Sequence, residues 1–160
     1  MKQAIATDLC RVCNLKPETI QHITTACSVI APKEYLNRHN DVAKIVHSHL
    51  CHKSHLIKEI PPYYKYNPSS VIENESTKIY WDTLIVTDKQ ILHNKPDILY
   101  INKTGKYAFV IDFAVPADSN IINAYTAKVT KYQDLLYELK RIYDLKKIEV
   151  CHRFSRKTTC

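Results

Sequence analysis

The sequence contains a single glycine and has no long apolar run. A membrane-spanning helix takes roughly 18 or more consecutive apolar residues, so we expect no membrane span. The opening MKQAIATDLCRVC has too few apolar residues before its first cysteine to be a signal peptide. We therefore expect an intracellular protein whose six cysteines act as thiols or metal ligands rather than as disulfides. The scarcity of glycine also argues against aspartic-protease chemistry, which needs glycine beside its catalytic carboxylates.

Lysine and arginine outnumber acidic residues by 23 to 16, which gives a formal charge of +7 and a pI near 9.0. Such a balance favours an anionic partner, either a nucleic acid or a membrane surface. At 160 residues the chain is long enough for one domain with a small appendage. The composition changes at residues 30–33, IAPK, where a cysteine-bearing start gives way to a helical pattern. We therefore predict a small module over residues 1–32 and a domain over residues 33–160.

The small module carries four residues of the types that bind zinc. Cys10, Cys13, His22 and Cys27 have the pattern C-x2-C-x8-H-x4-C, in which the first pair grips one side of a tetrahedral ion. A helix predicted over residues 19–26 would bring His22 and Cys27 close to one face after slight unwinding. The pattern predicts a structural zinc site, because protein ligands fill all four positions. The alternative is that the cysteines are small buried apolar residues and that His22 lies on the surface.

A second histidine-rich segment, HSHLCHKSH, begins at His47. His47, Cys51 and His55 have helical i, i+4, i+8 spacing, which would suit a second metal site. The interpretation that we favour is a solvated histidine-rich face of a helix.

The segment KPDILYINKTGKYAFVIDFAVP, from Lys95 to Pro116, predicts a β-hairpin. A two-residue turn at Thr104-Gly105, with the glycine at positive φ, would set Lys103 opposite Lys106. Counting outward from that pair sets Asp97 opposite Asp112 on one face, unless an odd-length loop or a bulge changes the register. Both faces of the two strands are apolar, which predicts interior strands.

Two neighbouring carboxylates at the end of such strands repel each other and resist burial. A shared proton, a basic partner or a divalent cation would each relieve the repulsion. We favour a hard cation such as Mg²⁺ or Mn²⁺, because such ions bind through a few carboxylates, water and phosphate.

The rest of the chain predicts a mixed α+β fold. Its elements are expected in the order α-β-β-β-α-β. A helix over residues 33–57 and a strand over residues 78–86 precede the hairpin, and a helix over residues 117–144 and a strand over residues 147–150 follow it. Asp118 and Ser119 are capping candidates for the second helix.

Lys128 lies in the middle of the apolar stripe of the long helix, and Lys131 lies at its edge. A buried lysine is costly unless it meets a negative charge, and this helix follows the Asp112 strand directly. We therefore expect Lys128 beside the carboxylates, where it would stabilise charge during phosphodiester hydrolysis. The alternative is that Lys128 reaches solvent beside the tyrosines.

These features together resemble the restriction-like endonuclease region of site-specific non-LTR retrotransposon polyproteins. The resemblance rests on the cysteine-histidine motif and on a series of ordered motifs, which are Arg38-His39-Asn40, Tyr80-Trp81-Asp82, Lys95-Pro96-Asp97 and the pattern AYxxKxxKY with Ala124, Tyr125, Lys128, Lys131 and Tyr132. It covers residues from Cys10 to about Lys147. The lysine of the usual PD-(D/E)xK signature would stand at position 114, which is Ala114, and the resemblance implies that Lys128 replaces it.

The resemblance implies a restriction-like core, preceded by the zinc module, that nicks target DNA to expose a 3′-OH primer for reverse transcription. It implies Asp97 and Asp112 as magnesium ligands, Lys128 as the catalytic lysine, and Lys131 with Tyr132 as supporting residues. Arg38 and His39 are candidates for positioning DNA, and the alternative is that they form a helix cap or a surface pair. Element RNA would be a further partner, and the protein would act in the nucleus. The sequence has no reverse-transcriptase catalytic motif, and its tail CHRFSRKTTC departs from the family. The alternative is a truncated, catalytically inactive copy that only binds nucleic acid.

Overall fold

A computed structural model of the chain describes residues 8–113 and 121–151, without the side chains of residues 25 and 121–125. The chain divides into two compact units, Met1–Asn40 and Asp41–Cys160. The division falls within the first long helix, α1 (Ala31–Lys53).

The first unit contains a short loop and one widened helical turn. The Cys10 N–H donates to the Lys16 carbonyl over 2.8 Å, and the Asn14 N–H donates back to the Cys10 carbonyl over 2.8 Å. Asn14 adopts a φ of 54°, a left-handed conformation that asparagine tolerates. The turn η1 (His22–Ala26) is π-helical, and the Cys27 N–H donates to the His22 carbonyl over 2.6 Å. This wider turn is the unwinding predicted between His22 and Cys27.

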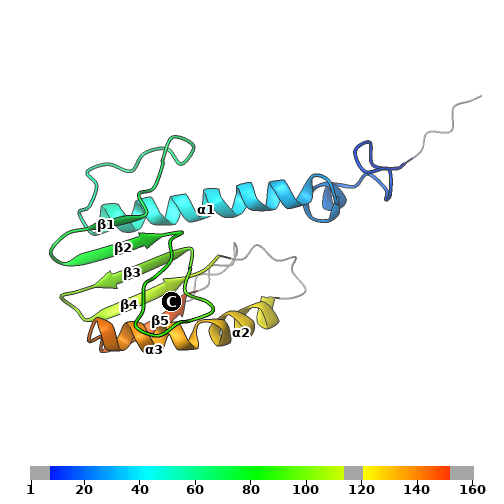
Figure 1. Ribbon diagram of the computed structural model, residues 1–160. Helices are drawn as coiled ribbons and strands as arrows, with labels where there is room; N and C mark the ends of the chain where they lie inside the picture. The colour runs from blue at the N-terminus through cyan, green and yellow to red at the C-terminus, as the bar shows by residue number, and fades with distance from the viewer. Residues whose placement is uncertain (1–7, 114–120, 152–160) are drawn as a thin grey trace, which may run out of the picture. The chain divides into compact units, whose positions relative to one another are not determined.

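The second unit contains a five-stranded sheet with the order β1-β2-β3-β4-β5. Neighbours are antiparallel from β1 to β4, whereas β5 is parallel to β4 (Figure 1). A parallel neighbour needs a crossover, which α2 (Ile121–Lys131) and α3 (Gln133–Ile142) supply. The fold is therefore mixed α+β and has the predicted order α-β-β-β-α-β, with β1 as an additional edge strand. The strands are β1 (Val71–Glu73), β2 (Thr77–Trp81), β3 (Ile98–Asn102), β4 (Tyr107–Ile111) and β5 (Lys147–Cys151).

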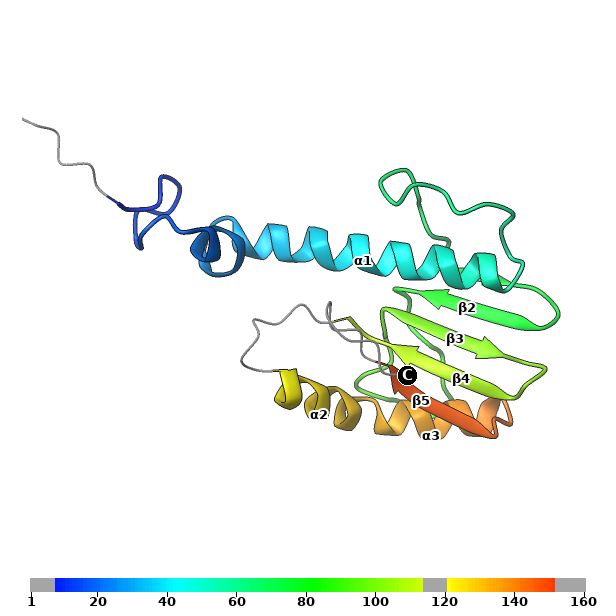
Figure 2. The same ribbon diagram turned by 180° about the vertical axis from the view of Figure 1, so that it is seen from behind.

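Helices cover both faces of this sheet, so the unit has three layers (Figure 2). On one face, Ala43 and Cys51 of α1 belong to a buried cluster with Ile79, Ile98 and Ile111. The cluster on the other face consists of Ile85, Leu99, Ile101, Ala108, Val110, Tyr132, Leu135, Leu139 and Leu145. Each fully buried aliphatic side chain contributes roughly 1.5–3 kcal/mol to the stability of the fold. Strands β3 and β4 are interior strands with two apolar faces, as predicted.

The hairpin has the predicted register but a different turn. Ile98 pairs with Ile111 and Asn102 pairs with Tyr107, so the register runs on toward Asp97 and Asp112. The loop has four residues, 103–106, and the positive φ of 54° belongs to Lys106, so the prediction of a left-handed Gly105 is wrong. A four-residue loop with the same centre as a two-residue turn leaves the register unchanged.

A close approach accounts for glycine at position 105. A Cβ atom there would lie 2.7 Å from Cε1 of the Tyr107 ring and 3.0 Å from Oδ1 of Asn102. The Gly105 N–H donates to that same Asn102 oxygen over 2.5 Å.

The helix predicted over residues 117–144 consists of two helices. Tyr132, with φ −100° and ψ 6°, separates α2 from α3. The predicted buried stripe is present at Tyr132, Leu135 and Leu139, which are at most 1% exposed. The capping candidates Asp118 and Ser119 lie outside the described residues.

The strand predicted over residues 78–86 ends early. Strand β2 stops at Trp81, because Asp82 adopts a left-handed φ of 40° and turns the chain out of the sheet. Ile85 nevertheless belongs to the buried cluster on the α3 side of the sheet.

His47 is fully buried between α1 and the sheet. Its Nδ1 atom lies 2.7 Å from the Tyr66 hydroxyl and 3.6 Å from Sγ of Cys51, and its ring meets the Trp81 ring edge-on at 5.2 Å. The interpretation of this segment as a solvated face is therefore wrong for His47 and Cys51, which share the sheet-facing stripe of α1. His49, His52 and His55 are exposed, and His55 lies beyond the end of the helix.

Burial lowers the pKa of His47 to about 4 from its ordinary value near 6.5. Above pH 6.5 the ring is neutral in both the folded and the unfolded chain. Between pH 6.5 and pH 4 only the unfolded chain takes up a proton on His47. As the pH falls through this range, we therefore expect the free energy of unfolding of the second unit to decrease by roughly 3 kcal/mol because of this residue. Urea unfolding, followed by fluorescence of the only tryptophan, Trp81, measures this loss.

The variant His47→Gln should be less stable at pH 7 and should show a flatter dependence on pH over this range. His49→Gln, an exposed position on the same helix, is the control and should keep the wild-type dependence. Equal slopes for all three proteins would contradict the prediction.

Candidate functional site

Asp97 and Asp112 lie at the same end of neighbouring strands. Asp97 directly precedes β3 and Asp112 directly follows β4, in continuation of the pairing of Ile98 with Ile111. Asp112 is 6% exposed, whereas Asp97 is half-buried. The strand geometry therefore brings together the two carboxylates that the hairpin pattern predicts as neighbours.

Donors from the crossover helices surround the Asp112 carboxylate. Lys128 Nζ donates to Oδ1 of Asp112, and the Tyr132 hydroxyl donates to Oδ2 over 2.6 Å. Lys131 Nζ lies 3.3 Å from Oδ2 and 3.0 Å from the Tyr132 hydroxyl. The side chain of Lys128 is only 20% exposed, so it points to the carboxylate rather than into solvent.

These contacts set the charge state of Asp112. Burial by itself raises the pKa of this carboxyl group, but the hydrogen bonds from Lys128 and Tyr132 and the charges of both lysines outweigh burial. The net result is a pKa of Asp112 below its ordinary value. Burial and the hydrogen bond to Asp112 raise the pKa of Tyr132, with a further contribution from the charge of Asp97. The site therefore holds an ionised carboxylate next to a neutral phenol.

Asp97 is connected to the same backbone segment. Its Oδ2 atom accepts the Phe113 N–H over 2.6 Å, and Lys128 Nζ donates to the Phe113 carbonyl over 2.7 Å. Both carboxylates and the Lys128 ammonium thus gather around the chain at Asp112 and Phe113. A shared proton, a basic partner or a divalent cation would each relieve the repulsion between the two carboxylates. The structure contains one of these, a basic partner for Asp112.

Asp82 is a third carboxylate at this end of the sheet, and it was not among the predicted ligands. Its N–H donates to the Asp97 carbonyl over 2.9 Å, and its Oδ1 lies 2.9 Å from Lys95 Nζ. The sequence did not fix this position, because a long loop joins β2 to β3; the register in the structure places Trp81 opposite Ile98 and so brings Asp82 next to Asp97.

The predicted zinc ligands form the second candidate site. The ligand atoms of Cys10, Cys13, His22 and Cys27 all lie within 4.8 Å of one another, and Sγ of Cys13 is 3.2 Å from Nε2 of His22. The edges of a zinc tetrahedron are roughly 3.5–3.8 Å, given bonds of about 2.0–2.3 Å. Among the described residues, this is the one group of three or more such side chains that could hold a metal ion, and its donors are compatible with zinc.

The thiols of the cluster differ in their protonation chemistry. A backbone hydrogen bond from Leu15 favours the thiolate of Cys13, but burial and the hydrogen bond with Cys10 outweigh it and raise the pKa of Cys13. Backbone hydrogen bonds from Cys13 and Val12 lower the pKa of Cys10 to about 7, which favours the thiolate that binds metal. Cys10 and Cys27 are fully buried and His22 is 6% exposed, so the unit is packed around its sulfur atoms.

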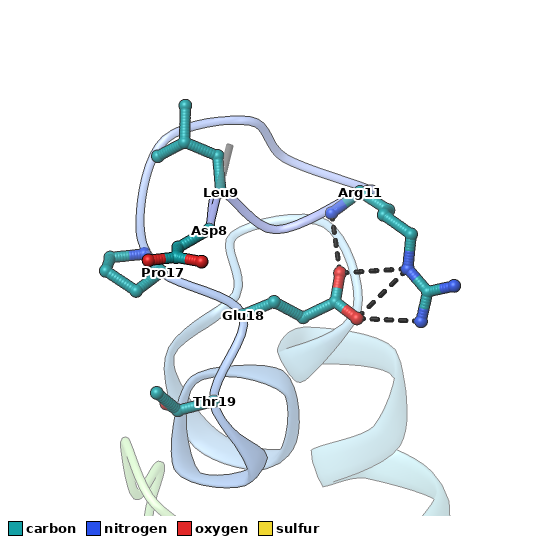
Figure 3. A pocket seen from close by; sticks show the side chains of 6 residues that line it. All are labelled: Asp8, Leu9, Arg11, Pro17, Glu18 and Thr19. Atoms are coloured by element: carbon teal, nitrogen blue, oxygen red, sulfur yellow. Dashed lines mark hydrogen bonds and ion pairs between the residues drawn. The ribbon is translucent and has the colours of Figure 1, made fainter. Parts of the chain in front are cut away.

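An ion pair joins Arg11, which lies between the first two cysteines, to Glu18. Figure 3 shows the Glu18 carboxylate facing Arg11, whose backbone N–H donates over 2.8 Å and whose Nη2 donates over 2.7 Å. Hydrogen bonds from Arg11 lower the pKa of Glu18 to about 2. A hollow of about 430 Å³ beside this pair is also lined by Asp8, Leu9, Pro17 and Thr19.

The proposed nucleic-acid residues Arg38 and His39 lie in the α1 segment of the first unit. Nη2 of Arg38 donates to the Thr24 carbonyl over 2.8 Å, which ties the helix to η1. Nδ1 of His39 lies 3.1 Å from Oδ1 of Asn40, and its ring stacks on Tyr35 at 6.3 Å. Both side chains are half-buried and have contacts within their own unit.

Comparisons of this chain with models of known protein families, with curated proteins and with solved structures found no match. Within residues 8–113 and 121–151, none of the helices has the length and apolar character needed to span a membrane.

Proposed function

We propose that the protein is a metal-dependent DNA endonuclease with a restriction-like core. The observation that carries this proposal is the set of contacts to Asp112, in which an ionised, buried carboxylate meets two lysines and a tyrosine beside Asp97. Two carboxylates can hold a metal ion, and nearby ammonium groups can stabilise negative charge during phosphodiester hydrolysis.

Each side chain has a role in this proposal. Asp97 and Asp112 offer hard oxygen ligands, and Mg²⁺ or Mn²⁺ bound there would polarise the phosphodiester and activate water. Lys128 stabilises negative charge on the phosphate oxygens, or orients the attacking water through its ammonium protons. Lys131 is 37% exposed and can contact a neighbouring phosphate, while Tyr132 fixes the orientation of Asp112.

The order of motifs along the chain supports a more specific proposal. In a non-LTR retrotransposon protein, this domain would nick target DNA in the nucleus and supply the 3′-OH primer for reverse transcription, with element RNA as a further partner. The zinc-compatible unit before the nuclease core would help to hold nucleic acid.

The alternative function is a catalytically inactive, zinc-containing module that only binds nucleic acid. Two observations favour it: Lys128 and Lys131 already neutralise Asp112, and position 114 holds an alanine where the usual signature has lysine. A carboxylate with a sufficient basic partner has no need of a cation.

Nicking of supercoiled plasmid distinguishes the two functions. We expect the zinc-loaded protein to convert supercoiled to open-circular DNA with Mg²⁺ or Mn²⁺ and not with Ca²⁺. Asp97→Ala should lose nicking yet retain binding that weakens with salt, because the basic surface is unchanged. Lys140→Ala, an exposed lysine on α3, is the control and should nick like wild type. Salt-sensitive binding without nicking by any of these proteins would favour the binding module.

A further inference from the structure

A hollow of about 400 Å³ lies at the C-terminal end of α1, and basic side chains dominate its lining. Among the described residues, no acidic side chain forms an ion pair with any of these basic groups. The two lysines of the lining carry like charges that repel each other, and an anion would relieve the repulsion. The lining residues are His52, Lys53, His55, Ile57 and Lys58.

Helix capping explains only part of this lining. His52 and Lys53 lie in the last turn of α1, where positive groups complement the helix dipole. His55 and Lys58 lie beyond the last helical residue, and the left-handed φ of 56° at His55 turns the chain there. Their position at the same hollow therefore needs another reason.

Exposed aromatic side chains follow the hollow along the chain. The loop after α1 passes back over that helix, where the Tyr66 hydroxyl contacts His47 (Figure 1). Tyr63 and Tyr64 are 43% and 69% exposed, and their rings meet edge to face at 5.6 Å. Lys65 Nζ lies 6.0 Å from the Tyr64 ring. Exposed rings interleaved with lysines are the platform on which unpaired bases stack.

The hollow lies at the opposite end of the sheet from the carboxylates. The Ser54 carbonyl, just after α1, accepts a hydrogen bond of 2.9 Å from the side chain of Asn74, which precedes β2. Asp97 and Asp112 lie at the other end of these strands, before β3 and after β4. The hollow is therefore separate from the proposed catalytic centre, whereas the loop that carries Tyr63 and Tyr64 returns along α1 to His47.

We infer that residues 52–65 bind a single-stranded nucleic acid, with its phosphates at the basic hollow and its bases on Tyr63 and Tyr64. A duplex hides the faces of its bases, and a lipid headgroup has no base to stack, so the combination of rings and cations fits an unpaired strand best. DNA and RNA strands share this chemistry. The inference concerns binding alone and does not depend on cleavage.

Fluorescence anisotropy with labelled 12-nucleotide strands tests the inference, on the full zinc-loaded chain without added divalent cation. We expect oligo-dT and oligo-U to bind more tightly than a 12-base-pair duplex and more tightly than vesicles containing anionic phosphatidylglycerol. Lys53→Ala/Lys58→Ala should weaken strand binding about tenfold and should reduce the slope of log K against log salt by about 1.4. Tyr63→Ala/Tyr64→Ala should weaken binding about tenfold at an unchanged salt slope.

Two exposed residues of α3 serve as matched controls. Lys140→Ala and Tyr137→Ala remove a lysine and a tyrosine from another surface and should leave strand binding unchanged. A preference between the DNA and RNA strands identifies the source of the ligand. Wild-type affinity in both double variants would overturn the inference, and so would tighter binding to duplex or to vesicles. Because no cleavage is measured, these outcomes are distinct from failure of the nuclease proposal.

Discussion

Replacing Asp112 with alanine is expected to abolish plasmid nicking and to lower the free energy of unfolding of the second unit by about 3–5 kcal/mol. The side chains of Asp112 and Lys128 are 8% and 20% exposed, so the variant leaves a largely buried ammonium without its counter-charge. The Phe113 carbonyl remains as an acceptor for Lys128, but it carries no full charge. Trp81 fluorescence in urea measures the stability, and conversion of supercoiled plasmid measures the nicking.

A second substitution separates the structural role of this ion pair from its chemical role. In Asp112→Ala/Lys128→Met no buried charge is unpaired, so most of the lost stability should return while nicking stays absent. Lys128→Met alone should reduce nicking about 10²–10³-fold, because the phosphate loses a nearby positive charge. Lys140→Met, at an exposed position of α3, is the matched control. Nicking by Asp112→Ala at the wild-type rate would refute the catalytic proposal, even if its stability falls as expected.

Removal of metal is expected to unfold the first unit and leave the second unit folded. The first unit has little apolar core of its own, since Leu15, Ile20 and Val29 are 72%, 84% and 60% exposed. Binding of structural zinc contributes about 10–16 kcal/mol in small zinc modules, which is more than such a unit can replace by packing. A chelator, or the variant Cys27→Ser, should therefore open the Arg11–Val12 bond to trypsin. The Trp81 transition of the second unit should not change.

Cys151→Ser is the control for this experiment, because Cys151 is a half-buried cysteine of β5 outside the cluster. It should retain one zinc per chain in a colorimetric assay, and its first unit should resist trypsin. Resistance of the chelator-treated protein to trypsin would show that the cysteines pack as apolar residues, which is the alternative that the sequence leaves open.

Local patterns carried most of what could be predicted about the candidate sites. The spacing of Cys10, Cys13, His22 and Cys27 predicts their meeting, because a tight loop and one widened turn need only nearby residues. The hairpin register was equally predictable, since a two-residue turn and a four-residue loop with the same centre set the same residues opposite each other. The turn itself was predicted wrongly, because the loop has four residues and its left-handed residue is Lys106 rather than Gly105.

Contacts between distant segments were less accessible from the sequence. The position of Lys128 in an apolar stripe indicated a negative partner, but the sequence did not show that Lys131 and Tyr132 share the same carboxylate. The regular helical period of the sequence also could not predict the interruption of the helix at Tyr132. The sequence likewise gave no reason to separate the buried His47 from its exposed neighbours, since only the position of the sheet decides which face of α1 is covered.

The sequence by itself determined the order of elements, the pairing of β3 with β4 and the residues of the metal cluster. These features depend on the spacing of residues along the chain, which can be read directly from the periodicity of apolar residues and from the lengths of short loops. Only the tertiary structure decided that Asp112 has Lys128, Lys131 and Tyr132 as partners, that Asp82 lies beside Asp97, and that the basic hollow lies at the far end of the sheet. These features depend on how a crossover helix and a long loop return to the sheet, and that is set by the packing of the whole unit.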